Sequence, residues 1–365
     1  MQGELSDEKV VVAESEAAIF EFKGYGRKKG RLELTLEEAA FLLETEKLTI
    51  KIKEEEEKEL NFKDFLNLAL GISPMFGLRY IVYRDLKERG YVVQPGGVDF
   101  WLYPRGAKPG EKPARYFIRI LSERGFFPLK ELDALLISAR NMRKEPIIAV
   151  VDEESDITYY DVKEAKFEKG EGERREKGEE IEKAIATLLG DRVVLWDVDL
   201  AENLNRKNFY GKLTKKKRLL LSLVEAAYLM KKGLLEIEVR EQNSGLGIAP
   251  PLKSVNFDQF IEHANSIEND FMDKYVVYEN LKEKGLIVKT GFKFGAHFRV
   301  YKAKQQKHSS YLIHVFPEEH VFSMHELSRA IRLAHGVKKR MIFSFKEKIG
   351  EESNIRYVDI GRMKL

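Results

Sequence analysis

The chain has 365 residues, and its 63 Lys and Arg against 60 Asp and Glu leave a formal net charge of only +3. Its length predicts at least two domains, and its 43% apolar and 34% charged residues exclude a disordered chain. The absence of cysteine excludes disulfides, thiolate metal sites and cysteine nucleophiles, and no apolar run is long enough to span a membrane.

The first predicted elements form a small α/β subdomain. A β-like run covers residues 10–15, a Tyr-Gly turn follows at Tyr25 and Gly26, and a helix contains the sequence EEAAFLL. A strand at 48–52 comes next. A helix at 62–70, whose apolar residues follow the 3.6-residue period, ends the subdomain.

A charged stretch divides the chain near its middle. Residues 165–184 are rich in Glu and Lys and interrupted by Gly, which is typical of a solvated linker. The sequence IEKAIATLLG at 181–190 has helical spacing, so we expect a helix at the start of the second half.

The second half repeats the first. The sequence YIVYRDLKERGYVV from Tyr80 matches YVVYENLKEKGLIV from Tyr275, and LTLEEAAFLL from Leu34 matches LSLVEAAYLM from Leu221. Because the matched blocks occur in the same order in both halves, the sequence indicates a tandem duplication.

The second copy predicts the fold of its C-terminal part. A helix at 275–285 precedes strands near 287–291, 297–301 and 311–317, a helix at 323–336 and strands at 340–345 and 355–361. This order is typical of an α+β domain with a mixed sheet. We therefore predict N-terminal subdomains at 1–70 and 185–262, and C-terminal subdomains at 71–164 and 263–365, joined by the linker at 165–184.

One segment of the second copy is strongly basic. Residues 286–308 contain six Lys or Arg, two His and no acidic residue. The aromatic residues in this segment are Phe292, Phe294, Phe298 and Tyr301. This pattern favours a nucleic-acid surface, with Lys293 and Arg299 as candidate RNA contacts. The alternative is an edge strand protected by lysines.

The two copies differ in the residues that could perform acid–base chemistry. All seven histidines lie in the last 103 residues, and histidine is the side chain that titrates near neutral pH. The second-copy residues Tyr301, His308, Arg332 and Lys339 align with Tyr103, Pro113, Ile137 and Lys144. Only the second copy can therefore carry a Tyr/His/Lys set. Taken singly, each of the three also fits an ordinary role as a strand tyrosine, a loop histidine or a solvated helix end.

These residues resemble a known family, the archaeal tRNA-splicing endonucleases, in their fused, duplicated and homodimeric form. The resemblance covers Tyr275 to Gly285, Lys289 to Tyr301, His308 to Val315 and Arg332 to Arg340. It implies that the C-terminal subdomains are nuclease-like and that only the second is catalytic. Family members often have Asp where this chain has His297.

The resemblance also implies the role of each site residue. Tyr301 would be the general base, His308 the general acid and Lys339 the cation that stabilises the transition state. Arg332 would be one of two arginines that clamp a bulged base, and Arg362 could be the second. The expected substrate is precursor tRNA with a bulge–helix–bulge, and we expect no metal, no cofactor, no membrane partner and a cytoplasmic location.

The first copy has an acidic segment for which the resemblance suggests a role. Asp152, Glu153, Glu154 and Asp156 lie between two strand-like runs, where composition alone favours an ordinary hairpin turn. In the family, an acidic loop at this place docks into a basic cleft on a catalytic unit of another chain. Since one chain offers one catalytic set and removal of an intron needs two cuts, we expect a homodimer.

The chemistry is consistent with these residue types. RNA is cut without metal when its 2′-OH attacks the adjacent phosphorus, which requires a base, an acid and a cation for the oxyanion. Two other functions stay open at this point, a non-catalytic RNA-binding or assembly subunit and a metal-dependent DNA nuclease. The basic segment, which has no carboxylates, argues against the latter.

Overall fold

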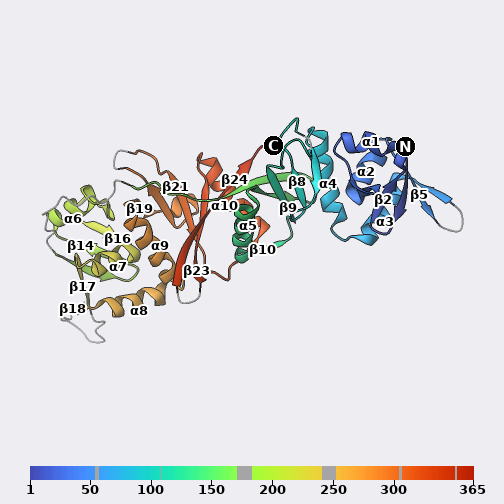
Figure 1. The fold of residues 1–365 in the computed structure, drawn as a ribbon. Helices are drawn as coiled ribbons and strands as arrows, with labels where there is room; N and C mark the ends of the chain where they lie inside the picture. Colours follow the sequence, from blue (N-terminus) through green and yellow to red (C-terminus); the bar gives the residue numbers. More distant parts are fainter. Residues whose placement is uncertain (54–56, 108, 171–182, 241–251, 304–305, 350–351) are drawn as a thin grey trace. The chain divides into compact units, whose positions relative to one another are not determined.

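The computed structural model describes residues 1–365 except 54–56, 108, 171–182, 241–251, 304–305 and 350–351 (Figure 1). It divides into two compact units. The first contains Met1–Lys163, Val321–Ser328 and Gly361–Leu365, and the second contains Glu164–His320 and Arg329–Ile360. Each unit is thus built mainly from one sequence repeat. Most of the predicted linker lies outside the described residues.

The first unit begins with a mixed sheet in the strand order β3-β4-β2-β1-β5-β6. Strand β1 pairs antiparallel with β2 and parallel with β5. The elements are β1 (Gln2–Ser6), β2 (Lys9–Val12), α1 (Glu14–Phe22), β3 (Arg27–Lys29), β4 (Arg31–Thr35), α2 (Leu36–Glu44), β5 (Thr49–Lys53), β6 (Glu57–Leu60) and α3 (Phe62–Ile72).

The second unit begins with the same arrangement. Its sheet has the order β15-β16-β14-β13-β17-β18, which repeats that of the first unit strand by strand. The elements are β13 (Ala184–Leu189), β14 (Arg192–Leu195), α6 (Val198–Arg206), β15 (Lys212–Leu213), β16 (Leu219–Leu221), α7 (Leu223–Lys231), β17 (Leu235–Arg240), β18 (Leu252–Val255) and α8 (Phe257–Ile267). The duplication therefore extends to the topology.

The C-terminal part of the first unit has strands in the order β12-β11-β9-β8-β7. Strands β9 and β11 are parallel and the other neighbours are antiparallel, so this part is mixed, as predicted. The elements are α4 (Phe76–Glu88), β7 (Val93–Pro95), β8 (Phe100–Leu102), β9 (Tyr116–Ser122), β10 (Phe126–Pro128), α5 (Leu129–Met142), β11 (Glu145–Val151) and β12 (Ile157–Glu164).

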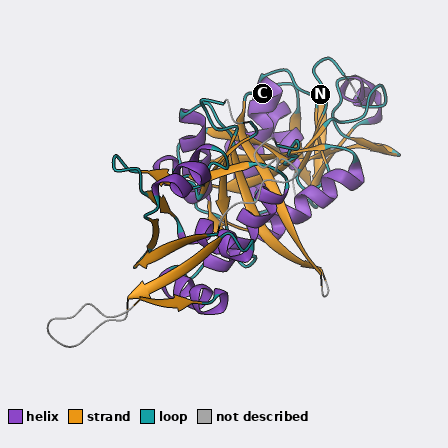
Figure 2. Cartoon of the chain, turned by 90° about the vertical axis from the view of Figure 1, so that its left-hand side faces the viewer, coloured by secondary structure: helices purple, strands orange, loops and turns teal. Residues whose placement is uncertain are grey.

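The C-terminal part of the second copy repeats this order as β24-β23-β21-β20-β19, again with one parallel pair, β21 and β23. Its elements are α9 (Phe271–Glu283), β19 (Ile287–Thr290), the 3₁₀ turn η1 (Phe292–Phe294), β20 (Phe298–Tyr301), β21 (Tyr311–Val315), β22 (Val321–Ser323), α10 (Met324–Gly336), β23 (Met341–Ile349) and β24 (Glu352–Met363). Strand β22 pairs with β10 inside the first unit. Figure 2 shows the mixture of helices and strands that defines the α+β class.

Two expectations about elements were wrong or incomplete. Of the segment expected to be a helix at 181–190, residues Ala184–Leu189 form strand β13 instead, because the alternate residues Ala184, Ala186 and Leu188 are buried in the sheet. Helices α1 and α6 were not predicted, and α1 begins at Glu14, inside the β-like run expected at 10–15.

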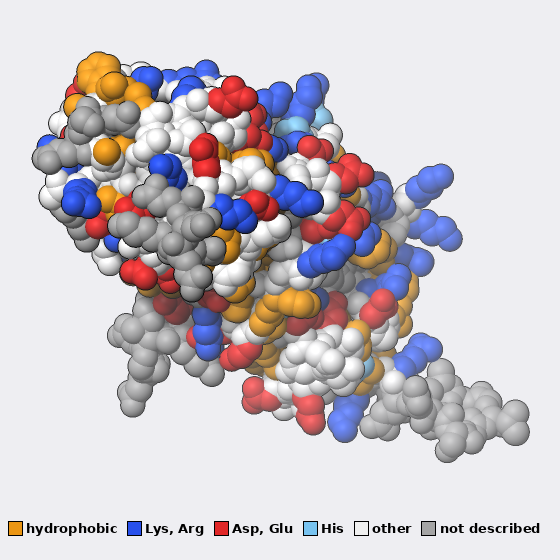
Figure 3. Space-filling model, turned by 90° about the vertical axis from the view of Figure 1, so that its right-hand side faces the viewer, with side chains coloured by type: hydrophobic (Ala, Val, Ile, Leu, Met, Phe, Trp, Pro, Cys, Tyr) orange, Lys and Arg blue, Asp and Glu red, His pale blue; other side chains and the backbone are white. Residues whose placement is uncertain are grey.

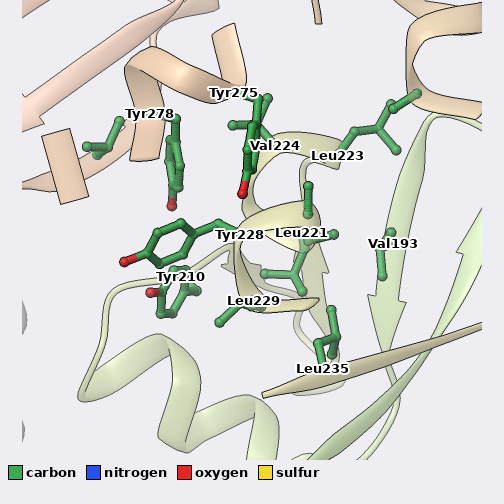
Figure 4. Packing of buried hydrophobic residues seen from close by; sticks show 14 of the residues in the cluster. Val193, Tyr210, Leu221, Leu223, Val224, Tyr228, Leu229, Leu235, Tyr275 and Tyr278 are labelled. Atoms are coloured by element: carbon green, nitrogen blue, oxygen red, sulfur yellow. The ribbon is translucent and has the colours of Figure 1, made fainter. Parts of the chain in front are cut away.

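Aromatic packing joins the subdomains inside the second unit. Tyr228 of α7 lies between Tyr210 of the Tyr-Gly turn and Tyr278 of α9 (Figure 4). The ring centroid of Tyr228 is 6.4 Å from that of Tyr210 and 5.7 Å from that of Tyr278. All three rings belong to one buried cluster that also contains residues of β13, β14, β20 and β23. This packing fixes the N-terminal sheet against the strands that carry Tyr301.

A buried glutamate holds the Tyr-Gly turn of each copy against the following helix. The carboxylate of Glu225 accepts the backbone N–H of Gly211 at 2.8 Å and that of Ser222, the N-cap of α7, at 3.0 Å. Glu38 does the same for Gly26 in the first copy. The sequence EAA therefore recurs in both halves with its glutamate in the same structural role.

Charged side chains of both signs share the surface. On the face shown in Figure 3, Lys and Arg are interspersed with Asp and Glu. This mixture agrees with the net charge of +3.

Candidate active site

Tyr301 ends strand β20 and is half-buried. Antiparallel pairing with β19 places Ile287 opposite Tyr301 and Lys289 opposite Arg299. Because alternate residues of a strand point to the same side, these four side chains share one face of the hairpin. That face borders a cavity of about 560 Å³ inside the second unit.

The cavity is basic and lies between the two subdomains of the second unit. Its acidic lining residues are engaged, because Asp191 pairs with Arg192 at 2.8 Å and Glu225 holds the Tyr-Gly turn. The cationic lining residues are Arg192, Lys212, Lys289, Arg299 and Lys307. We call this cavity the basic pocket.

Two of these cations are held by backbone carbonyls. The Lys289 ammonium donates to the Gly211 oxygen at 2.8 Å, and burial lowers its pKa although the carboxylate of Glu225 opposes the shift. The Arg299 guanidinium donates from Nε to the Thr290 oxygen at 2.8 Å. Both side chains are therefore fixed in the wall of the pocket.

The loop after Tyr301 carries His308 and contacts Lys339. Ser310 donates its N–H to the Val300 oxygen at 2.7 Å, which closes the loop beside Tyr301. The Lys339 ammonium donates to the carbonyl oxygen of Ser309, the neighbour of the exposed His308. Tyr301 therefore precedes the loop that carries His308, and Lys339 contacts this loop at Ser309.

The first copy shows the same framework without the histidine. Lys144 donates to the Ala114 oxygen at 2.7 Å, as Lys339 does to Ser309. The Tyr103 hydroxyl donates to Oε1 of Gln94 at 3.0 Å, and burial raises the pKa of that phenol. The lysine contact is therefore part of the duplicated fold.

The corresponding cavity of the first copy is smaller and electrically balanced. It measures about 280 Å³ and is lined by two cations, Lys9 and Arg27, and two carboxylates, Glu33 and Glu38. Lys9 pairs with Glu33 at 2.7 Å. The basic character of the pocket is thus a property of the second copy.

The remaining predicted RNA contacts lie on several elements. Lys293 is exposed on η1, and Arg332 is exposed on α10. Arg362 is exposed near the end of β24, in the segment that belongs to the first unit. Phe298, which the sequence places among the surface aromatics, is only 6% exposed and packs on Tyr278 in the core.

The acidic segment forms a turn between β11 and β12. The Asp152 carboxylate accepts the N–H groups of Glu154 and Asp156 at 3.0 Å and 2.8 Å, so it shapes the turn. Glu153 pairs with Arg124 at 2.6 Å. Glu154 and Asp156 are exposed.

The sequence did not reveal that Arg192 and Lys212 share a cavity with Tyr301. They lie on β14 and β15, about 90 to 110 residues before it, and only the packing of α7 on α9 brings the two sheets together. A partial signal was present, since Lys212 directly follows the repeated Tyr-Gly turn. No described group of three or more His, Asp or Glu side chains is placed to hold a metal ion.

Family models match the chain in duplicate. The model for the tRNA intron endonuclease catalytic C-terminal domain matches residues 76–159 and 271–357. The model for the tRNA intron endonuclease N-terminal domain matches residues 1–66 and 184–249. None of the described helices has the length and apolarity needed to cross a membrane.

Full-length relatives agree with these models. A protein named tRNA-splicing endonuclease from Methanosarcina barkeri is 43% identical over 371 residues, which covers 100% of both chains. A protein of the same name from Methanococcoides burtonii is also 43% identical over 371 residues and covers 100% of both chains. Another from Haloarcula marismortui is 32% identical over 370 residues, covering 96% of this chain and 95% of the relative.

Proposed function

The chain belongs to the tRNA intron endonuclease family, and we propose that it is a tRNA-splicing endonuclease that cuts precursor tRNA at bulge–helix–bulge junctions without a metal ion. The observation that carries this proposal is the similarity of both copies, over the full chain, to relatives with that name. The convergence of Tyr301, His308 and Lys339 on one loop, in one copy only, supports it.

In the proposed reaction the substrate supplies the nucleophile. Tyr301 takes the proton of the 2′-OH as that oxygen attacks the adjacent phosphorus. The bond to the 5′-oxygen breaks, and His308 donates a proton to that leaving group. The products are a 2′,3′-cyclic phosphate and a 5′-hydroxyl, so no water is consumed in the step.

Lys339 is the proposed electrostatic contributor. An ammonium group beside the scissile phosphate stabilises the extra negative charge of the crowded phosphorane. The Ser309 carbonyl holds the ammonium next to His308, so the fold keeps this cation in place before substrate arrives. Such preorganisation lowers the barrier because little has to move during the reaction.

The other basic residues are proposed to bind RNA. Arg332 and Arg362 would each stack a guanidinium plane on a splayed bulge base, since such planes stack well on aromatic bases. Lys293 and Arg299 would contact phosphates nearby. Arg332 and Lys293 are exposed and therefore accessible to a macromolecular substrate.

We also propose a homodimer in which the acidic turn of one chain docks into the basic pocket of the other. Charge complementarity supports this contact, because the turn exposes Glu154 and Asp156 while the pocket has five cations. The balanced cavity of the first copy would not attract the turn. Docking at the pocket would border Tyr301 and so couple assembly to catalysis.

Cleavage of a bulge–helix–bulge RNA in excess chelator tests the function. Wild type should release fragments with cyclic phosphate and 5′-hydroxyl ends, and His308→Ala should lower the single-turnover rate by about 10²-fold or more. His335→Ala, an exposed histidine of α10, is the matched control and should cut normally. Binding of RNA without cleavage by wild type would instead indicate a non-catalytic subunit, and cutting that stops in chelator would indicate a metal nuclease.

A further inference from the structure

A second basic surface lies on the N-terminal sheet of the second unit. Trp196 directly follows β14 and is 45% exposed. Its indole N–H donates to Oγ1 of Thr187 at 2.8 Å, and the Arg218 guanidinium lies 4.6 Å from the ring centroid. The ring is thus held at the surface with a planar cation stacked on it.

The hairpin between β15 and β16 completes a shallow cavity beside this ring. The cavity has a volume of about 310 Å³ and is lined by Val194, Trp196, Thr214, Lys215, Lys216, Arg218 and Leu220, none of them acidic. Lys217 of the same hairpin pairs with Glu202 at 3.0 Å, whereas Lys215 and Lys216 have no acidic partner among the described residues. We call this surface the tryptophan shelf.

The shelf adjoins the candidate active site. Leu220 lines both the shelf and the basic pocket, and Lys212 of the pocket lies on β15, the strand that leads into the hairpin. The shelf therefore extends the positively charged surface of the second unit beyond the pocket that borders Tyr301.

The first copy lacks the shelf. Val10 and Val193 occupy the same place in the two sheets, since they pair with the matched residues Leu34 and Leu221, so Ala13 stands where the second copy has Trp196. Glu33 correspondingly takes the place of Leu220. The copy without the Tyr/His/Lys set thus has neither the aromatic ring nor the uninterrupted basic lining.

We propose that the tryptophan shelf binds a single-stranded segment of the RNA substrate, with one base stacked against the Trp196–Arg218 pair and phosphates on Lys215 and Lys216. Aromatic rings and arginine planes stack on any base, and lysines bind phosphates without reading sequence. This inference rests on the proposed function, because it requires an RNA substrate.

The first test measures binding without cleavage. The probe is a bulge–helix–bulge RNA with 2′-deoxy residues at both cleavage positions, and its Kd is measured from 50 to 300 mM salt. Trp196→Ala should weaken binding by about tenfold, and Trp196→Phe should restore most of it. Lys215→Ala/Lys216→Ala should weaken binding and reduce the slope of log K against log salt by about 1.4.

The matched control comes from the first copy. Lys28→Ala/Arg31→Ala removes two exposed cations from the equivalent hairpin, where Ala13 takes the place of Trp196, and should leave both Kd and salt slope unchanged. Equal Kd values for wild type, Trp196→Ala and the double lysine variant would overturn the proposal. A change in oligomeric mass without a change in Kd would also overturn it, because it would assign the shelf to a protein partner.

Tryptophan fluorescence reports on the shelf directly. The sequence contains two tryptophans, so the difference between wild type and Trp196→Phe isolates the emission of Trp196. Adding the RNA should quench this emission, and high salt should reverse the quench. An unaffected Trp196 signal at saturating RNA would contradict the proposal. Failure of wild type to cut a normal RNA would instead contradict the proposed function, so the two failures are distinct.

Discussion

At the scale of single residues, two histidines of the second copy, His297 and His314, are half-buried structural groups. Nδ1 of His297 accepts the N–H of Val315 at 2.9 Å, and the ring lies 4.3 Å from that of His314. Burial lowers the pKa of His297 to about 3 and that of His314 to about 4, so both are neutral at neutral pH. Lys274 favours the neutral form as well, while Asp270 opposes it.

This burial predicts acid sensitivity. The histidine pKa of the unfolded chain is about 6.5, so the unfolded state binds more protons as the pH falls below that value. The stability contributed by neutral His297 is present at pH 7 and is lost between about pH 6.5 and 3. Urea midpoints at pH 7, 6 and 5 should fall steeply for wild type and less steeply for His297→Gln. Exposed His335→Gln should follow wild type, and identical slopes for all three proteins would contradict the argument.

The buried glutamate of the Tyr-Gly turn predicts a matched pair of stability losses. Glu225→Ala removes the acceptor of two backbone N–H groups, and buried donors without partners cost about 2–3 kcal/mol of unfolding free energy. Glu38→Ala should cost a similar amount in the first copy. Denaturant unfolding measures both. Glu236→Ala on the surface of β17 should change stability by less than about 0.5 kcal/mol, and a similarly small effect of Glu225→Ala would refute a structural role.

At the scale of elements, one amide side chain bridges the two ends of the loop between β20 and β21. Oε1 of Gln306 accepts the N–H of Lys302 at 3.0 Å and the hydroxyl of Ser310 at 3.1 Å. These bonds join the two ends of the loop that carries His308. Positioning of His308 should therefore depend on Gln306.

We expect Gln306→Ala to lower the rate of RNA cleavage without lowering the stability of the fold. Loss of both bonds should lower the single-turnover cleavage rate by about tenfold or more, because small misplacements of a catalytic group are costly. The thermal midpoint should stay near that of wild type, since the loop lies outside the core. Lys338→Ala, an exposed change after α10, is the control. A Gln306→Ala enzyme with full activity would show that the loop is positioned by other contacts.

The sequence predicted the elements with strong periodicity and missed those decided by packing. Helices such as α9 and strands such as β20 agree with the expectation, because their patterns and turn residues are local. The spacing of apolar residues at the start of the second copy predicts a helix. The segment is strand β13 instead, because it pairs parallel with β17 and antiparallel with β14. The roles of Tyr301, His308 and Lys339 come from the resemblance and stay predictions. The cations of β14 and β15 could not be placed, because their position depends on the contact between α7 and α9.

At the scale of the whole molecule, the small net charge is the sum of two specialised copies. The second copy has the basic pocket and the tryptophan shelf, and the first has an exposed acidic turn and a balanced cavity. The small net charge of the chain therefore results from a basic surface on the second copy and an acidic turn on the first, which are complementary in charge. In a symmetric dimer each acidic turn would meet the pocket of the partner, which gives two equivalent contacts.

Charge reversal tests this arrangement. Glu154→Lys/Asp156→Lys changes two exposed side chains and leaves Asp152, which shapes the turn, in place. In size-exclusion chromatography, the apparent mass of the variant should fall from that of a dimer toward the 42.3 kDa of a single chain. The fall should be larger at low salt, where charge repulsion is less screened. Reversal of an exposed acid elsewhere in the first unit, Glu111→Lys, should leave the dimer intact.

A compensating change makes the same prediction specific to the pocket. If Asp156 approaches the exposed Lys307 of the partner, Lys307→Glu should weaken the dimer alone and restore part of it when combined with Asp156→Lys. Because docking borders Tyr301, cleavage should be lost with the dimer and return with it. If the dimer dissociates in both single variants and does not re-form in the double variant, the acidic turn contacts another surface. A monomer that cuts at the full rate would separate catalysis from assembly.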